Sequence, residues 1–259
     1  SEIRGIFGGG RNPAVNTNTI DYITIASQGN AIDFGDQSRN YMAAGGMSSS
    51  TRGIFAGGYA PSLPDLDMEY VEIATLGNAL DFGDLFTGAY YSGTASSPTR
   101  GVYAGGNNPS GSVATIQNLT IASLGNMIKF GDLTEARSGM AGGGNSVRGI
   151  FCGGYVTTAP SGKKFRQTID YVTIASEGNA TTFGESIPSA TTGISQRSGS
   201  GSNQTRAVFA GGQDNSSAVN SMEFVTIATT GNTQDFGDLP ESQRAVAVLS
   251  DSHGGLGGF

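Results

Sequence analysis

The chain repeats one unit five times along its 259 residues. Each copy opens with an Arg-small-apolar-aromatic phrase that runs into a pair of glycines. The opening arginines are Arg4, Arg52, Arg100, Arg148 and Arg206. They are 48, 48, 48 and 58 residues apart. This spacing predicts a single domain of repeats at approximately 4–51, 52–99, 100–147, 148–205 and 206–259.

A second phrase follows the first in every copy, and copy one reads Ile20-Asp21-Tyr22-Ile23-Thr24-Ile25-Ala26-Ser27-Gln28-Gly29-Asn30-Ala31-Ile32-Asp33-Phe34-Gly35-Asp36. Every copy keeps its Gly-Asn pair and its Phe-Gly pair. The repeated phenylalanines are Phe34, Phe82, Phe130, Phe183 and Phe236. Five matches in register predict a common structural role for these residues.

Each copy reads as four short strands. The opening phrase is a compact apolar run, and Asp170 to Ala175 alternates β-branched, aromatic and polar residues with a period of two. The Gly-Asn pair is typical of a tight hairpin turn. A Gly- and Ser-rich fourth strand follows, and helical periodicity is missing. Four strands in about 48 residues fit one propeller blade, so we predict an all-β, five-bladed β-propeller with four antiparallel strands per blade.

The end of the chain is expected to close the ring. Because each copy starts at the Gly-Gly strand, the fourth strand of one copy becomes the innermost strand of the next blade. The segment from Arg244 to Leu249 then becomes the innermost strand of the first blade and leaves no bare sheet edge. We expect truncation after Pro240 to destroy the fold.

These phrases resemble known repeats. An apolar strand ending in Gly-Gly, a Tyr-Val-type strand, a turn and an aromatic-bearing strand look like a kelch-like repeat, in which the five phenylalanines stand where kelch repeats have Trp. The wording Arg-Gly-Ile-Phe-Ala-Gly-Gly with Thr-Ile-Ala-Ser-x-Gly-Asn also resembles repeats in virion structural proteins of marine tailed bacteriophages. This resemblance implies a virion component of the tail, fibre or capsid surface, assembled in the host cytoplasm.

Antiparallel order places two kinds of loop on opposite faces. The Gly-Asn turns and the segments before each arginine repeat almost word for word, which indicates a structural face. The loops after Gly-Gly and after Phe-Gly-Asp differ in every copy and make a variable face, where we expect the binding site. The candidate residues there are Arg11, Asn12, Tyr59, Asp65, Asp67, Tyr91, Asn107, Asn108, Tyr155, Lys163, Lys164, Arg166, Asp214 and Asn215.

Three possible chemistries stay open. Tyr59, Tyr90, Tyr91 and Tyr155 lie among many Asn and Ser and could stack on sugars, or they could simply pack. The basic group Lys163, Lys164 and Arg166 could contact an acidic neighbouring subunit in a homo-oligomer, or be a solvated loop. The repeated arginines could form an anion ring, but a structural role on a neighbouring blade's carbonyls is favoured because the guanidinium is planar and rigid.

The acidic residue after each Phe-Gly pair raises the question of calcium. These residues are Asp36, Asp84, Asp132, Glu185 and Asp238. Carboxylates suit Ca²⁺, but the spacing of a calcium loop is missing, and an Asp that accepts backbone N–H bonds in a turn explains the repetition. The Asp-Phe-Gly letters at Asp33, Asp81 and Asp235 occur without the other kinase motifs. We therefore expect no metal and no cofactor.

The composition argues against nucleic acid and a membrane as partners. The net charge is −7 with 14 Lys and Arg, which argues against nucleic acid. No apolar stretch approaches the ~20 residues of a membrane span, so we expect no membrane insertion. Cys152 in an apolar strand is expected to be a buried core residue. His253 is not expected to belong to a catalytic triad, because the sequence has no Gly-x-Ser-x-Gly nucleophile elbow. Two facing carboxylates would suffice for a glycosidase, although no pair stands out.

The sequence therefore predicts a protein that is not an enzyme. The leading hypothesis is a structural or adhesion module of a virion that contacts other virion proteins or a host-surface glycan. The alternatives are a carbohydrate-binding lectin propeller and a glycan-cleaving enzyme.

Overall fold

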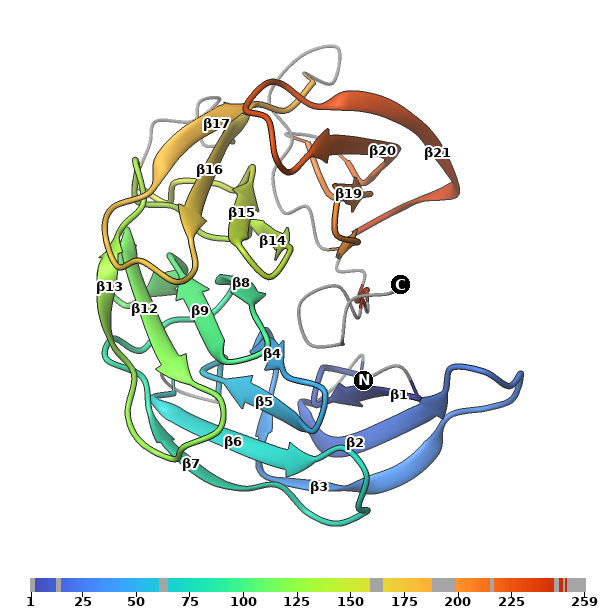
Figure 1. Ribbon diagram of the computed structural model, residues 1–259. Coiled ribbons are helices and arrows are strands. Elements are labelled where there is room, and N and C mark those ends of the chain that lie inside the picture. Colours follow the sequence, from blue (N-terminus) through green and yellow to red (C-terminus); the bar gives the residue numbers. More distant parts are fainter. Residues whose placement is uncertain are drawn as a thin grey trace.

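The protein is a five-bladed β-propeller (Figure 1). The computed structural model describes residues 3–12, 15–60, 65–158, 165–187, 199–214, 217–244, 247–248 and 250. In these residues no helix is present that is long and apolar enough to span a membrane. The predicted fold class is confirmed.

The sheets follow the order of the repeats. The first blade contains β1 (Arg4–Gly8), β2 (Thr17–Thr24) and β3 (Ile32–Tyr41). The second contains β4 (Gly45–Ser48), β5 (Arg52–Ala56), β6 (Asp67–Glu72) and β7 (Leu80–Asp84). The third contains β8 (Gly93–Ser96), β9 (Arg100–Ala104), β12 (Thr115–Thr120) and β13 (Ile128–Asp132). The small hairpin of β10 (Asn107–Asn108) and β11 (Gly111–Ser112) is inserted in the third blade.

The last two blades follow the same order. The fourth contains β14 (Ala141–Gly144), β15 (Arg148–Cys152), β16 (Thr168–Thr173) and β17 (Thr181–Glu185). The fifth contains β18 (Gly199–Ser202), β19 (Arg206–Ala210), β20 (Val219–Thr226) and β21 (Gln234–Gln243). In blades two to five the innermost strand comes from the end of the preceding copy, as the phase of the repeat predicts.

The described end of the chain lies at the inner edge of the fifth blade. The Ser250 hydroxyl donates a hydrogen bond to the carbonyl of Ser202 in β18. Ser202 in turn donates to the carbonyl of Gly144 in β14 at 2.6 Å. Ser250 thus continues the sequence of inner strands into the next position of the ring, where the predicted closing strand belongs. Residues 245, 246, 249 and 251–259 lie outside the described residues.

A clasp of two hydrogen bonds joins the Phe-Gly pair of one blade to the Gly-Asn pair of the next at the four junctions from blade one to blade five. Between blades two and three, Gly125 N donates to the Phe82 carbonyl at 2.8 Å. Asp84 N donates to Asn126 Oδ1 at 3.0 Å. Gly83 has φ +134°, and a Cβ there would lie 2.6 Å from the backbone of Gly125, so only glycine allows this approach. The same pair of bonds joins Phe34 and Asp36 to Gly77 and Asn78, Phe130 and Asp132 to Gly178 and Asn179, and Phe183 and Glu185 to Gly231 and Asn232.

The repeated arginines reach across the same junctions. Arg52 Nη1 donates to the Ile121 carbonyl at 2.9 Å, and its guanidinium lies over the Tyr70 ring at 4.5 Å from the centroid. The equivalent bonds join Arg4 to Ile73, Arg100 to Ile174 and Arg148 to Ile227 at 2.8–3.0 Å.

The side chains that pack between the blades form the core, in which Phe34, Phe82, Phe130 and Phe183 are 2–4% exposed.

Candidate functional site

The two kinds of variable loop meet at the axial end of one face. In blades two, three and four, the residue that follows the Gly-Gly pair forms an isolated bridge with a residue just before the inner strand of the same blade. These pairs are Met42 with Tyr59, Tyr90 with Asn107 and Ser138 with Tyr155. Because the inner strands surround the centre of the ring, these loops lie around the axis of the propeller.

Aromatic side chains gather at this axial position. The rings of Tyr59 and Tyr90 lie 5.1 Å apart at 62°, and those of Tyr90 and Tyr91 lie 5.3 Å apart at 59°. Tyr155 lies close enough to Tyr91 to contribute to the raised pKa of the Tyr91 phenol. We call Tyr59, Tyr90, Tyr91 and Tyr155 the axial tyrosine cluster. It joins three of the candidate residues, Tyr59 and Tyr91 from the second repeat and Tyr155 from the fourth.

Tyr91 holds an unusual backbone conformation. Its φ is +57°, in the left-handed region that costs a bulky residue about 1–2 kcal/mol. The equivalent residues of the neighbouring copies, Ala43 and Gly139, have φ of +59° and +68°. Tyr91 N donates to the Ala43 carbonyl at 3.2 Å, and Gly139 N donates to the Tyr91 carbonyl at 2.6 Å. A large ring therefore stands where a glycine would fit with less strain, and such strain is concentrated at functional sites.

Polar groups surround the cluster. Asn107 Nδ2 donates to the Tyr90 hydroxyl at 2.8 Å, and Asn107 Oδ1 is buried without a partner among the described residues. Burial, with Tyr155 and Tyr90 nearby, raises the pKa of Tyr91, whereas Arg11 and Arg244 oppose the rise. The cluster thus combines aromatic faces, a tyrosine hydroxyl held by an amide and two cations on blades one and five.

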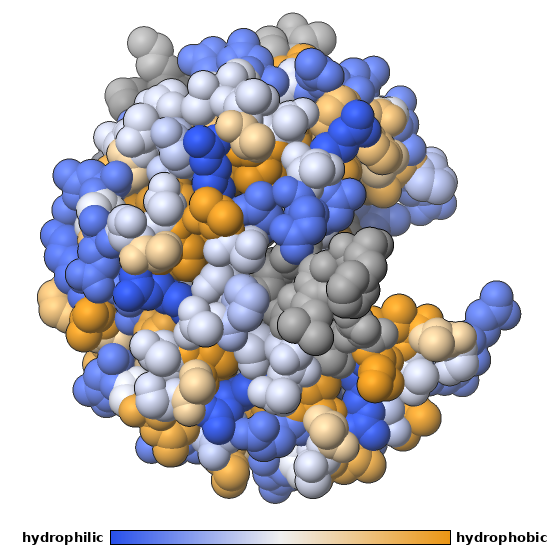
Figure 2. All heavy atoms as spheres, in the orientation of Figure 1, coloured by the Kyte–Doolittle hydropathy of each residue, from blue (hydrophilic) through white to orange (hydrophobic). Residues whose placement is uncertain are grey.

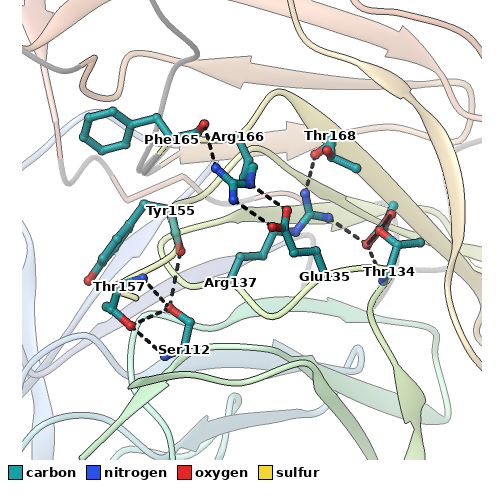
Figure 3. A network of polar contacts seen from close by, with 10 residues as sticks. Ser112, Thr134, Glu135, Arg137, Tyr155, Thr157, Phe165, Arg166 and Thr168 are labelled. Carbon is teal, nitrogen blue, oxygen red and sulfur yellow. Dashed lines mark hydrogen bonds and ion pairs between the residues drawn. The ribbon is translucent and has the colours of Figure 1, made fainter. Parts of the chain in front are cut away.

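The inserted hairpin of blade three forms hydrogen bonds with the loop that carries Tyr155. Figure 3 shows the Ser112 hydroxyl directed at the Tyr155 carbonyl, to which it donates at 3.4 Å. Ser112 N donates to the Thr157 hydroxyl at 2.9 Å, and Thr157 N donates to the Ser112 hydroxyl at 3.1 Å. The loops of blades three and four are therefore held together beside the cluster.

Of the basic group Lys163, Lys164 and Arg166, the structure describes Arg166, and this residue is engaged within the chain. Arg166 forms a bidentate ion pair with Glu135, with Nε–Oε2 at 2.6 Å and Nη2–Oε1 at 2.7 Å (Figure 3). The hydrogen bond to Arg166 holds the pKa of the Glu135 carboxyl below its usual range. Lys163 and Lys164 lie outside the described residues.

The remaining polar candidates that the structure describes are engaged within the chain. Asp65 is buried and accepts a hydrogen bond from Arg39 Nη1 at 2.9 Å, and Asp67 also pairs with Arg39. The side-chain oxygens of three others accept backbone N–H groups within tight turns. These are Asn12 from Val15, Asn108 from Ser110 and Asp214 from Ser217, each at 2.9 Å. Asn215 lies outside the described residues.

The described residues contain no group of three or more His, Cys, Asp or Glu side chains placed to hold a metal ion. Cys152 is buried, and His253 lies outside the described residues. A groove of about 190 Å³ lies at the outer rim beside Gly178 and Asn179. It is smaller than the ~300–1,000 Å³ typical of small-molecule pockets, so the axial surface is the stronger candidate.

The candidate residues from sequence did not include two neighbours of Tyr91. The sequence singles out Tyr90 only as one of several tyrosines, and it places Arg244 in the predicted closing strand. Both occupy the same position in the repeat, five residues after Leu85 and Leu239. Alignment of the copies on these leucines is the signal that would have found them.

No protein-family model matches the chain, and no curated protein matches its sequence.

Proposed function

We propose that the protein is a non-catalytic adhesion module that binds carbohydrate through the axial tyrosine cluster. The observation that carries the proposal is the strained backbone of Tyr91, which presents a ring beside Tyr90 although glycine occupies the equivalent position of copy three. Aromatic faces stack on the apolar faces of sugars, and nearby amides bond their hydroxyls. The Asn107 amide donates to the Tyr90 hydroxyl at 2.8 Å and so fixes the orientation of that ring within the cluster.

A glycan array tests this function. We expect the wild-type protein to bind a subset of glycans, and Tyr59→Ala and Tyr91→Gly to lose at least tenfold in affinity. Tyr22→Ala, a substitution at the outer rim under Arg4, is the matched control and should keep binding. An array on which the wild-type and the Tyr91→Gly variant behave alike would exclude the cluster as the binding surface.

The proposal has two further parts: the protein is a component of a phage virion, and it does not cleave the glycan that it binds. Kelch-like repeats and a place in a phage tail, fibre or capsid surface are supported only by the repeated phrases of the sequence. Mass spectrometry of purified particles tests the second, and absence from the particles contradicts it. Release of reducing ends from a bound polysaccharide would show an enzyme instead of an adhesion module.

A further inference from the structure

The junction between the fifth and first blades differs from the other four. Phe236 is 50% exposed, whereas its four equivalents are 2–4% exposed. Ile25 is 52% exposed, whereas Ile73, Ile121, Ile174 and Ile227 are 0–5% exposed. At each of the other junctions these two residue positions are covered by the neighbouring blade. Figure 2 shows that the molecule is open on this side, between the fifth and the first blade.

The clasp is also incomplete there. Among the described residues no hydrogen bond joins the Gly29-Asn30 turn to Phe236 or Asp238, although the equivalent bonds are present at the other four junctions. The Arg206 guanidinium lies over the Phe224 ring at 4.6 Å from the centroid. No bond from it to a neighbouring blade is present in the described part of the chain.

The two exposed surfaces are the two halves of one interface. We call the side of blade five that carries Val208, Met222, Phe236 and Leu239 the trailing face. These residues are partly or fully exposed, whereas Ile54, Met68, Phe82 and Leu85 in the same positions of blade two are buried. The side of blade one that carries Phe7, Ile23 and Ile25 is the leading face, and its equivalents in blade three, Tyr103, Leu119 and Ile121, are buried.

We propose that the trailing face of one copy binds the leading face of a second copy, head to tail. The four internal junctions show that these two faces match, because each buries the same residue types with the same backbone bonds. With those four junctions formed, the two faces of a single chain lie on either side of the opening in Figure 1. A second copy covers one of these faces without changing any internal junction, and the other face stays free for a third.

The contact between copies misses a hydrogen bond that three of the four internal junctions have. Inside the ring, Ser38, Thr134 and Ile187 donate a backbone N–H to an acidic residue of the next blade: Glu69, Asp170 and Glu223 respectively. Pro240 stands in the equivalent position of blade five and has no N–H to donate to Asp21. The contact therefore lacks one bond, and we expect it to be weaker and reversible. It is heterologous, so each added copy leaves one face of each kind free.

Sedimentation of the full chain over a concentration series tests the proposal. We expect wild-type protein to associate with rising concentration, and Phe236→Asp and Ile25→Asp each to sediment as a monomer. A mixture of the two variants should form a dimer and nothing larger, because each variant keeps one intact face. Ile128→Asp is the matched control: Ile128 is 55% exposed, as are its counterparts Ile32 at 55% and Leu80 at 58%, and it should associate like wild type.

Three results would overturn it. The first is wild-type protein that stays monomeric at every concentration tested. The second is a mixture of the two variants that forms no dimer. The third is a monomer in which Phe236→Asp lowers the melting temperature as much as Phe82→Asp, because that would mean that Phe236 is buried by ring closure within one chain.

Discussion

Arg137 and Asp170 form an ion pair between blades three and four with both side chains fully buried. Arg137 Nη2 lies 2.8 Å from Asp170 Oδ2. The Asp170 carboxylate also accepts hydrogen bonds from the backbone and hydroxyl of Thr134, and Arg137 Nη1 donates to the Thr168 carbonyl at 2.6 Å. Burial lowers the pKa of Arg137, and the neighbouring carboxylate counteracts this.

Breaking this pair should be strongly destabilising. Asp170→Asn leaves a buried guanidinium without its counter-charge, and we expect a loss of about 3–5 kcal/mol in the free energy of unfolding. Denaturant unfolding measures it. Lys129→Met is the control, because the Lys129–Asp132 pair has both side chains about half exposed and should contribute about 1 kcal/mol or less. Equal losses in the two variants would contradict the dependence on burial.

The clasp allows a comparison between two copies of one residue. Asn126→Ala removes the acceptor of the Asp84 N–H bond, and we expect it to cost about 1 kcal/mol. Asn30 has the same position in copy one but accepts no such bond among the described residues, so Asn30→Ala should change the free energy of unfolding little. A cost for Asn30→Ala as large as that for Asn126→Ala would show that the fifth junction is clasped within the chain.

The repeat predicted the blades, their strand phase and the existence of shared structural residues. Gly-Asn and Phe-Gly pairs recur in register, so a common role follows from the sequence, and the structure shows that this role is contact between blades. The different environment of Phe236 could not be predicted, because its letters match those of Phe82 and its burial depends only on whether a neighbouring blade covers it.

The site was predictable only in part. The loops after Gly-Gly and Phe-Gly-Asp were assigned to one face because of antiparallel order, and their bridges join them. The burial of Asp65 against Arg39 was not predictable, since no local pattern pairs residues 26 positions apart. The positive φ of Tyr91 was also hidden, although Gly139 at the same repeat position carried the signal.

Tyr91 should show a separation of stability from binding. Tyr91→Gly relieves a left-handed conformation and also removes contacts with Tyr90. We therefore expect the melting temperature to stay within a few degrees of wild type while glycan binding is lost. Tyr91→Ala keeps the strain and removes the same ring, so it should melt below Tyr91→Gly. The reverse order of the two melting temperatures would contradict the strain at this position.

The buried phenol of Tyr41 predicts a loss of stability in alkali. Burial, together with the nearby carboxylates of Glu69 and Asp65, raises the pKa of Tyr41 to about 12. Its unfolded value is about 10, so above pH 10 the unfolded chain binds fewer protons than the native one and stability falls as the pH rises. Below pH 10 this contribution is constant. We expect Tyr41 to reduce the free energy of unfolding by about 1–2 kcal/mol as the pH approaches 12. Denaturant unfolding at a series of pH values measures the slope, and Tyr41→Phe should make it shallower because it removes the titrating group. An unchanged slope in Tyr41→Phe would assign the alkaline transition to another tyrosine.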